Sequence, residues 1–377
     1  MKYFLQFFVL CFSFFIFLPR PTFAIYDPLS VPNNKFGIHI LDTSEIQKAA
    51  ELANSGGGDW GYVTIPIRAN DRDLLKWSKF MEEAKRLHLI PILRIASFPV
   101  DDHWMAPNEY DLVDFANFLE ELPWPVKNRY IIVYNEPNHD SEWGGFVYPE
   151  EYAKVLDRAI EIFHQENPDY FVISAGMDAS APSSDTSLDE YSYFRLMNAA
   201  VPGIFKKVDG FSSHAYGNPA FTSSPNIYSP VSVASYRFEE RYLEKLGADK
   251  LPVFITEAGW KINLIGDQYS NKFYLQSFNN IWNDSNIVAI TPFILNAQEG
   301  AFRDFSFLDN SGNWKTFARE IMNISKVKGQ PLQDKTPTRS YNLGPGNKSS
   351  AARANTDLPI LSLFSLLESM LRTFLPN

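Results

Sequence analysis

Eight short apolar segments alternate with amphipathic segments over residues 36–325, and this alternation limits the fold more than any other feature of the chain. The apolar segments are nearly continuous hydrophobic runs, as expected for parallel strands that are buried on both faces. The segments between them carry apolar residues at intervals of three and four, which indicates helices packed on a sheet. The predicted strands are 36–41, 62–68, 89–97, 129–138, 170–178, 208–217, 251–260 and 287–296.

The number of these units favours one closed barrel. A (β/α)8 barrel typically needs about 250 residues, which the predicted region supplies. The alternative, an open doubly wound sheet, would have a glycine-rich phosphate-binding turn after its first strand. Here Leu-Asp-Thr-Ser-Glu follows the first strand at 41–45, and the three glycines at 56–58 precede a strand. The sequence therefore predicts an α/β fold, a single (β/α)8 TIM barrel over residues 25–325.

The two ends of the chain differ from the barrel region. Residues 1–24 contain an early Lys, an apolar run and a Thr-Phe-Ala ending, which is typical of a cleaved secretory signal peptide; an uncleaved anchor helix is the alternative. Residues 326–357 are polar and rich in Pro, Gly, Asn and Ser, which predicts a flexible linker. Residues 358–377 predict an amphipathic C-terminal helix that lies on a membrane surface, docks on the barrel or pairs with a partner.

Cysteine content and net charge restrict where the protein can function and what it can bind. The only cysteine, Cys11, lies in the predicted signal peptide, so the mature chain would have neither disulfides nor thiol chemistry. Loss of Lys2 and Arg20 would leave 32 basic against 44 acidic residues, a net charge of -12. An acidic chain without clustered Lys and Arg is a poor nucleic-acid binder. We expect a secreted or cell-surface protein, with peripheral membrane contact through residues 358–377 as one option and an undetermined oligomeric state.

Two glutamates stand at the ends of predicted strands. Glu136 lies in Tyr-Asn-Glu-Pro-Asn after the fourth strand, and Glu257 lies in Phe-Ile-Thr-Glu-Ala-Gly-Trp after the seventh. In (β/α)8 enzymes the carboxyl ends of the strands form the active site. Two carboxyl groups from different strands suit cleavage of a glycosidic bond, in which one protonates the leaving oxygen and the other attacks the anomeric carbon.

These two strings resemble the signatures of glycoside hydrolase clan A, whose members are retaining glycosidases on TIM barrels, and the resemblance covers the barrel but neither end. It implies that Glu136 is the acid/base, that Glu257 is the nucleophile, and that a carbohydrate is cleaved without a cofactor. It also implies that Asn135 binds the sugar 2-hydroxyl, that Tyr216 holds the nucleophile and that His214 lines the sugar subsite. The Asn-Glu-Pro-Asn run is somewhat like family 39, with family 5 as an alternative.

Two positions depart from the clan pattern. Many members carry an Arg in the second strand, where this chain has Thr64, so that Arg68 or Arg94 would have to supply the charge. The eighth strand usually presents a Trp to the sugar, and Phe293 stands there instead. Both departures concern the subfamily and the substrate more than the two glutamates.

Four further residues are candidates for substrate binding. His39 ends the first strand, and Arg94 lies in the third, where a buried Arg needs a carboxylate partner. Trp143 and Trp260 follow the two glutamates and are expected to stack on sugar rings, with packing inside the protein as the alternative. Glu142 is the nearest rival acid, and we interpret it as a loop charge.

The sequence favours no other site chemistry. Its histidines form neither an HxH nor an HExxH pair, so we predict that no metal is required. Neither a glycine-rich nucleotide loop nor a serine nucleophile elbow is present. Two roles without catalysis stay open: a carbohydrate-binding protein, which the presence of both glutamates disfavours, and a tethered scaffolding protein. The sugar, the linkage, endo or exo action, and hydrolysis or transglycosylation are left open by these residues.

Overall fold

A computed structural model describes residues 25–334, so the predicted signal peptide and the predicted C-terminal helix lie outside the described residues. Its central element is an eight-stranded sheet whose strands pair in parallel. In order they are β1 (Gly37–His39), β2 (Gly61–Arg68), β3 (Leu89–Ala96), β6 (Arg129–Val133), β7 (Tyr170–Ser174), β8 (Gly210–Tyr216), β9 (Val253–Gly259) and β10 (Ile287–Ile290). Each predicted strand is present, although three end well before the predicted residue: β6 at Val133 and not at 138, β7 at Ser174 and not at 178, and β10 at Ile290 and not at 296.

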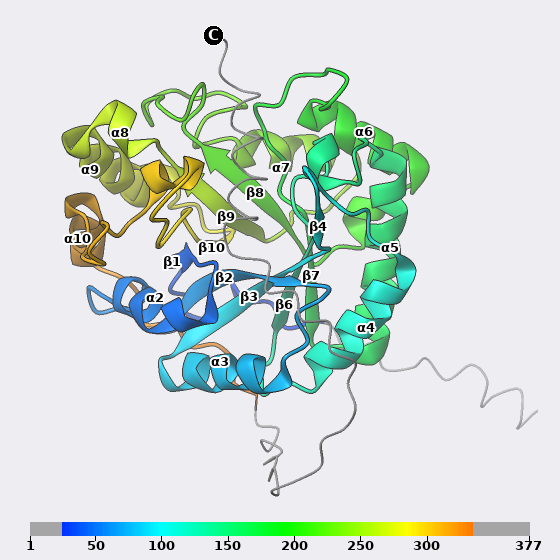
Figure 1. Ribbon diagram of the computed structural model, residues 1–377, viewed down its shortest axis with the longest axis horizontal. Helices are drawn as coiled ribbons and strands as arrows, with labels where there is room; N and C mark the ends of the chain where they lie inside the picture. Colours follow the sequence, from blue (N-terminus) through cyan, green and yellow to red (C-terminus); the bar gives the residue numbers. More distant parts are fainter. Residues whose placement is uncertain (1–24, 335–377) are drawn as a thin grey trace, which may run out of the picture.

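Helices surround this sheet (Figure 1). They are α2 (Ile46–Ala53), α3 (Leu74–Arg86), α4 (Glu109–Glu120), α5 (Pro149–Glu166), α6 (Glu190–Ala200), α7 (Tyr236–Lys245), α8 (Ile262–Ile265), α9 (Asp267–Gln276) and α10 (Thr316–Asn323). Three start at side-chain caps, because Asp73, Asn108 and Asp189 accept backbone N–H groups of the first turn. A small hairpin, β4 (Pro99–Val100) and β5 (His103–Trp104), extends the loop after β3. Within residues 25–334, no helix has the length and apolar character needed to cross a membrane.

The sheet closes on itself between β1 and β10. Phe36 and Ile290 form a parallel bridge, and the N–H of Ile290 donates to the carbonyl of Lys35 at 2.8 Å. The N–H of His39 donates to the carbonyl of Pro292 at 3.1 Å. An open sheet would leave its first and last strands unpaired. The predicted (β/α)8 barrel is therefore confirmed, and the doubly wound alternative is excluded.

The barrel interior changes from apolar to polar along the strands. Near the amino ends it is filled by aromatic rings whose centroids lie 5.1–6.2 Å apart. These rings belong to Tyr62, Tyr130, Phe171 and Phe254. Farther along, inward positions are polar: the hydroxyls of Thr64 and Thr291 are 2.8 Å apart, and Ser212 bonds Thr256. An apolar base thus supports a polar carboxyl end.

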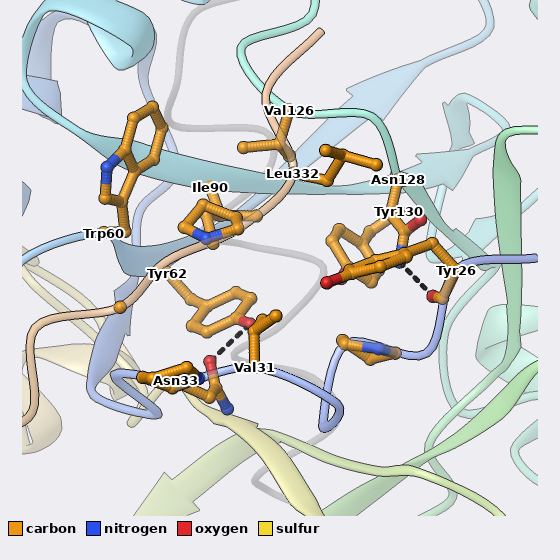
Figure 2. A pocket seen from close by; sticks show the side chains of 14 residues that line it. Tyr26, Val31, Asn33, Trp60, Tyr62, Ile90, Val126, Asn128, Tyr130 and Leu332 are labelled. Carbon is orange, nitrogen blue, oxygen red and sulfur yellow. Dashed lines mark hydrogen bonds between the residues drawn. The ribbon is translucent and has the colours of Figure 1, made fainter.

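Residues 25–34 close the amino end of the barrel (Figure 2). The hydroxyl of Tyr62 donates to the side-chain oxygen of Asn33 at 2.8 Å, and the amide of Asn128 donates to the carbonyl of Tyr26 at 2.8 Å. The space beneath this segment next to Trp60, Tyr62 and Tyr130 is about 20 Å³, enough for about one water molecule. A second, more open pocket of about 350 Å³ lies between residues 25–29 and the starts of β7 and β9. Around Tyr62 and Tyr130, this end of the barrel is therefore a packed base.

A second segment, residues 326–334, crosses the same end, and we call it the C-terminal strap. Its backbone pairs with the loops that lead into the strands: Lys328 bridges Asp59, and the carbonyl of Leu332 accepts from Lys127 at 2.7 Å. Composition predicted a flexible linker from residue 326 onward, which is wrong for this part, because its backbone groups have partners on the barrel. The rest of the predicted linker lies outside the described residues.

Candidate active site

Glu136 lies on a strained turn after β6. Tyr134 and Glu136 have φ angles of 68° and 28°, a left-handed conformation that costs a non-glycine residue about 1–3 kcal/mol. The turn is held by the N–H of Glu136, which donates to the carbonyl of Gly176 at 3.1 Å. It is also held by the ring of Tyr134, which packs edge-on against Trp143 at 5.6 Å. Strain that the surroundings hold in place in this way is typical of functional sites.

Glu257 reaches the barrel mouth through a bulge in β9. The pairing of β8 with β9 shifts just before His214, which pairs with Glu257, so β9 has one extra residue at Thr256. Thr256 already faces the interior, where its hydroxyl bonds Ser212. Strict alternation would then turn the next side chain outward. The bulge instead directs Thr256 and Glu257 to the same side, as bulges beside active sites often do.

Both carboxylate oxygens of Glu257 accept hydrogen bonds. Arg94 donates to Oε1 at 2.6 Å, and the hydroxyl of Tyr216 donates to Oε2 at 2.8 Å. The sequence suggested Arg68 or Arg94 as the replacement for the arginine of the second strand, and Arg94 makes this ion pair from β3. Thr64, at the position expected for that arginine, is fully buried within the barrel.

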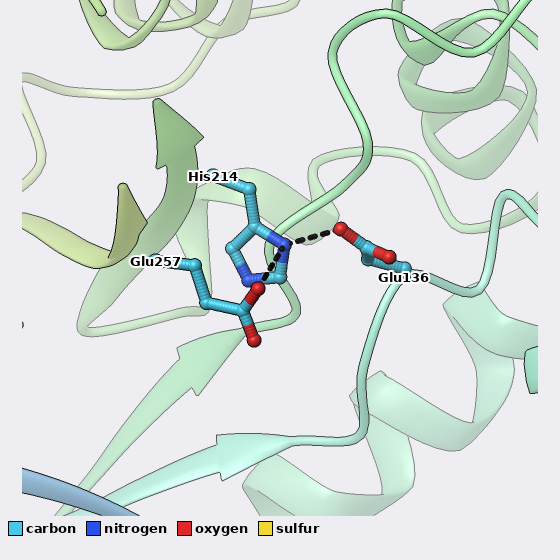
Figure 3. Close-up of side chains that lie close together, drawn as sticks. All are labelled: Glu136, His214 and Glu257. Carbon is cyan, nitrogen blue, oxygen red and sulfur yellow. Dashed lines mark hydrogen bonds and ion pairs between the residues drawn. The ribbon is translucent and has the colours of Figure 1, made fainter. Parts of the chain in front are cut away.

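His214 lies between the two glutamates (Figure 3). Its Nδ1 is 2.6 Å from Oε1 of Glu136 and 3.8 Å from Oε2 of Glu257. One oxygen of each glutamate and one nitrogen of His214 all lie within 4.8 Å of one another. Carboxyl groups of retaining glycosidases are about 5–5.5 Å apart, against roughly 6.5–9.5 Å in inverting ones. Glu136 and Glu257 are thus near enough for both acids to act on one bound molecule.

The surroundings keep Glu257 ionised. Burial by itself would raise the pKa of Glu257, but the positive charges of His214 and Arg94 outweigh it and lower the pKa to about 2. Burial also opposes protonation of His214, yet the carboxylates of Glu257 and Glu136 raise the pKa of that imidazole. Glu136 is the more open of the two acids, with 19% of its side chain exposed against 9% for Glu257. The surroundings thus hold the buried Glu257 as an anion, while Glu136 is partly exposed to solvent.

A third carboxyl group, that of Glu142, lies against Asn135. Its Oε1 accepts from the amide nitrogen of Asn135 at 3.1 Å, and the amide oxygen of Asn135 accepts from Arg94 at 2.6 Å. Burial and the charge of Glu136 raise the pKa of Glu142 to about 8. The interpretation of Glu142 as a loop charge is therefore wrong. Sequence reasoning missed it because its burial depends on how the short turn at 140–142 folds back, which no local pattern encodes.

His39 forms part of the wall behind Glu257. It is fully buried, with Nδ1 3.8 Å from Oε1 of Glu257 and 3.4 Å from the carbonyl of Thr256. Burial and the charge of Arg94 lower the pKa of His39 to about 3, so the ring is neutral. Its edge packs against Phe293 at 5.2 Å. The structure thus brings His39 to the site, beside the carboxylate and away from solvent.

The two tryptophans that we expected to stack on sugar do not line the opening. Trp143 is 1% exposed, between Tyr134 and Tyr152, and Trp260 is fully buried. The indole N–H of Trp260 donates to the carbonyl of Ser223 at 2.7 Å. Neither ring offers an exposed face, so the expectation of sugar stacking is corrected to internal packing. Trp143 supports the strained turn that carries Glu136.

The same three residues, Glu136, His214 and Glu257, are also the candidate ligands for a metal ion. Among residues 25–334, Glu136, His214 and Glu257 are the one group of three carboxylate or imidazole ligands close enough to share an ion. Both oxygens of Glu257 are already bonded, and the guanidinium of Arg94 is 2.6 Å from one of them. A cation in that position repels a divalent ion. The donor set therefore suits proton transfer better than metal binding.

Comparisons with known proteins place the fold. No protein-family model and no curated protein matches the chain. A family 39 glycoside hydrolase from the gut symbiont Bacteroides cellulosilyticus WH2 is 16% identical, with a TM-score of 0.51 over 80% of this chain and 65% of that one. A family 128 (subgroup II) endo-β-1,3-glucanase from Sorangium cellulosum is 14% identical, with a TM-score of 0.51 over 76% and 97%.

A third structure shows a bound sugar. It is a family 5 subfamily 18 variant from Bifidobacterium longum subsp. longum in complex with Manβ1-4GlcNAc, 14% identical, with a TM-score of 0.54 over 78% of each chain. This chain spans slightly less than two thirds of the family 39 enzyme but almost all of the family 128 glucanase. At these identities the likeness establishes the fold, and at that level the resemblance to clan A barrels is confirmed.

Proposed function

We propose that this protein is a glycoside hydrolase that cleaves an O-glycosidic bond with retention of configuration. The observation that carries the proposal is the carboxyl pair of Glu136 and Glu257, within 4.8 Å at the carboxyl end of the barrel, with Glu257 held as an anion. The resemblance of its barrel to structures of glycoside hydrolases supports the same reading.

In the proposed reaction Glu257 attacks the anomeric carbon while Glu136 donates its proton to the departing oxygen. A covalent glycosyl-enzyme results. Glu136 then removes a proton from water, which attacks the same carbon and releases Glu257. Arg94 and Tyr216 hold the nucleophile in place through both steps, since each bonds one of its oxygens. Asn135, fixed by Arg94, would present its amide to the sugar 2-hydroxyl.

The wider setting belongs to the same proposal. The enzyme would be exported through residues 1–24, act on carbohydrate outside the cytoplasm, and need neither a metal nor an organic cofactor. Contact of residues 358–377 with a membrane surface would keep it near the cell.

The test combines substitution with product analysis. Purified protein is assayed on p-nitrophenyl glycosides and on soluble β-1,3-glucan, β-1,4-mannan and β-1,4-galactan, and proton NMR follows the anomer that forms first. We expect the substrate's configuration to be retained. Glu257→Gln should lower kcat/KM by about 10⁴-fold or more, because no attacking carboxylate remains.

Azide distinguishes the two glutamates. With an activated aryl glycoside, azide should restore turnover to Glu136→Ala and give a glycosyl azide of retained configuration, since attack on the glycosyl-enzyme then needs no base. Glu299→Gln, which removes an exposed glutamate from the loop after β10, is the matched control and should behave like the parent. Inverted product, or full activity in Glu257→Gln, would refute the proposal.

A further inference from the structure

The exposed aromatic side chains gather on one face of the barrel. In the described part of the chain they lie in loops that follow strands, or in the first turns of the helices after those loops. They are Phe98 (39% exposed), Tyr110 (86%), Phe146 (57%), Tyr148 (45%), Tyr228 (54%) and Tyr269 (55%). All of them therefore belong to the carboxyl end of the barrel, which also holds the two glutamates.

Four of these rings lie on two loops that contact each other. The loops after β3 and β6 supply Phe98, Tyr110, Phe146 and Tyr148, and the two strands are neighbours in the sheet. The loops touch, because the N–H of Gly144 donates to the carbonyl of Trp104 at 2.7 Å. The rings of Phe146 and Tyr148 stack 5.3 Å apart with their planes 16° apart. We call the stacked pair of Phe146 and Tyr148 the aromatic platform.

The platform belongs to the same loop as the proposed acid/base. Glu136 and the Phe146–Tyr148 pair belong to the same loop, between β6 and α5. Large aromatic rings contribute to stability when they are buried, so rings left open side by side in a soluble barrel indicate an interaction surface. Trp143, in the same loop, is buried, which shows that the loop can enclose an aromatic ring.

The chemistry of the two loops points to a neutral sugar chain. A sugar ring presents an apolar C–H face to an aromatic ring and keeps its hydroxyls at the rim. Residues 97–111 and 139–151 contain no Lys or Arg and several Asp and Glu, so a polyanionic glycan would be repelled. A neutral glycan pays no such electrostatic penalty.

We propose that the aromatic platform binds sugar units of an extended neutral glycan beyond the bond that is cleaved, so that the substrate is an oligo- or polysaccharide. The inference rests on the proposed glycosidase function and adds a substrate class to it. A small glycoside held at the two glutamates would leave this stacked pair of rings unused.

The experiment compares F146A/Y148A with Tyr269→Ala. Tyr269 is about as exposed as Phe146 and lies in the first turn of α9, after β9. For each protein, kcat/KM on the best soluble polysaccharide is divided by kcat/KM on the best p-nitrophenyl glycoside. We expect this ratio to fall by about tenfold in F146A/Y148A, as loss of anchoring aromatic rings predicts, and to stay unchanged in Tyr269→Ala. Thermal melting checks that each variant is folded.

Affinity electrophoresis in gels that contain β-1,3-glucan, β-1,4-mannan or β-1,4-galactan gives an independent readout. Glu136→Gln protein should be retarded, and addition of F146A/Y148A should remove the retardation. If the parent cleaves no glycoside but F146A/Y148A still abolishes binding, the hydrolase proposal fails and the platform stands. An unchanged ratio with unchanged retardation, or equal losses in Tyr269→Ala, overturns the platform. Loss of binding to phosphatidylcholine vesicles instead of glycan would also overturn it.

Discussion

The amino end of the barrel and its carboxyl end place similar residues in opposite settings. At the amino end, Tyr62 and Tyr130 are buried and bonded beneath residues 25–34. At the carboxyl end, Phe146 and Tyr148 are exposed, and charged groups replace apolar ones in the interior. Burial of apolar surface stabilises a fold, whereas exposed rings and confined charges contribute little to stability and can act on a ligand. The comparison indicates that one end maintains the fold and the other holds the candidate active site.

Trp60→Ala tests the stabilising role of the amino end. Trp60 is 5% exposed and stacks on His88 at 4.6 Å. Removing so large a buried ring should lower the free energy of unfolding by about 3–5 kcal/mol, measured by urea denaturation. Below the melting temperature kcat/KM should not change. A Phe98→Ala control at the carboxyl end should cost roughly 0.5 kcal/mol or less. Equal losses of unfolding free energy in the two variants would contradict the view that the amino end stabilises the fold more than the carboxyl end does.

Glu142→Ala tests whether a buried acid at the carboxyl end acts on function. The change leaves the amide nitrogen of Asn135 without its acceptor, which should cost about 1–3 kcal/mol in the transition state, or roughly 10–100-fold in kcat/KM. Glu142→Gln keeps a carbonyl acceptor and should remain within a few-fold of the parent. If both variants lose activity equally, Glu142 does not position Asn135.

Comparison of Glu142→Gln with the parent protein also tests a predicted effect of pH on stability. Burial raises the pKa of Glu142 from 4.5 to about 8, so between these values the folded protein keeps a proton that the unfolded chain releases. Stability therefore falls as pH rises through this window. Glu142→Gln lacks this titration, and its Tm relative to the parent should increase from pH 4.5 to pH 8. A difference that is constant with pH would show that Glu142 titrates normally.

Lys326→Met tests the C-terminal strap and should have the smallest effect. The buried ammonium of Lys326 donates to the carbonyls of Ile321 at 2.8 Å and Ile324 at 3.2 Å, at the end of α10. Methionine keeps the apolar stem but removes these bonds, so we expect a loss of about 1 kcal/mol in urea denaturation. Lys328→Met, at an exposed position, should be neutral. A neutral Lys326→Met would show that the strap is held by its backbone alone.

Sequence reasoning worked where a single strand or turn determines the outcome. Continuous apolar runs predicted the strands, because a buried parallel strand needs no polar face. The position of Glu136 and Glu257 after such runs predicted that both reach one end of the barrel. Residue patterns also narrowed the replacement arginine to Arg68 and Arg94, and only the contact between β3 and β9 side chains distinguishes them.

What sequence could not predict depends on contacts between distant segments. Alternation along β9 would turn Glu257 away from the interior, and the bulge that corrects this arises from the pairing with β8. From sequence, Trp143 and Trp260 are expected to stack on sugar rings, because the loops that enclose both indoles cannot be predicted from local pattern. The strap is polar in composition, but its backbone pairs with the loops that lead into the strands.

The packed base has a consequence for how the protein can be held. Residues 25 and 334, the first and last that the structure describes, both lie with the segments that close the amino end. A tether attached at either point would pull on the base and leave the opposite mouth turned outward. Attachment at one end of the chain or at both would then turn the carboxyl end of the barrel away from the attachment point, where large polymers could reach it.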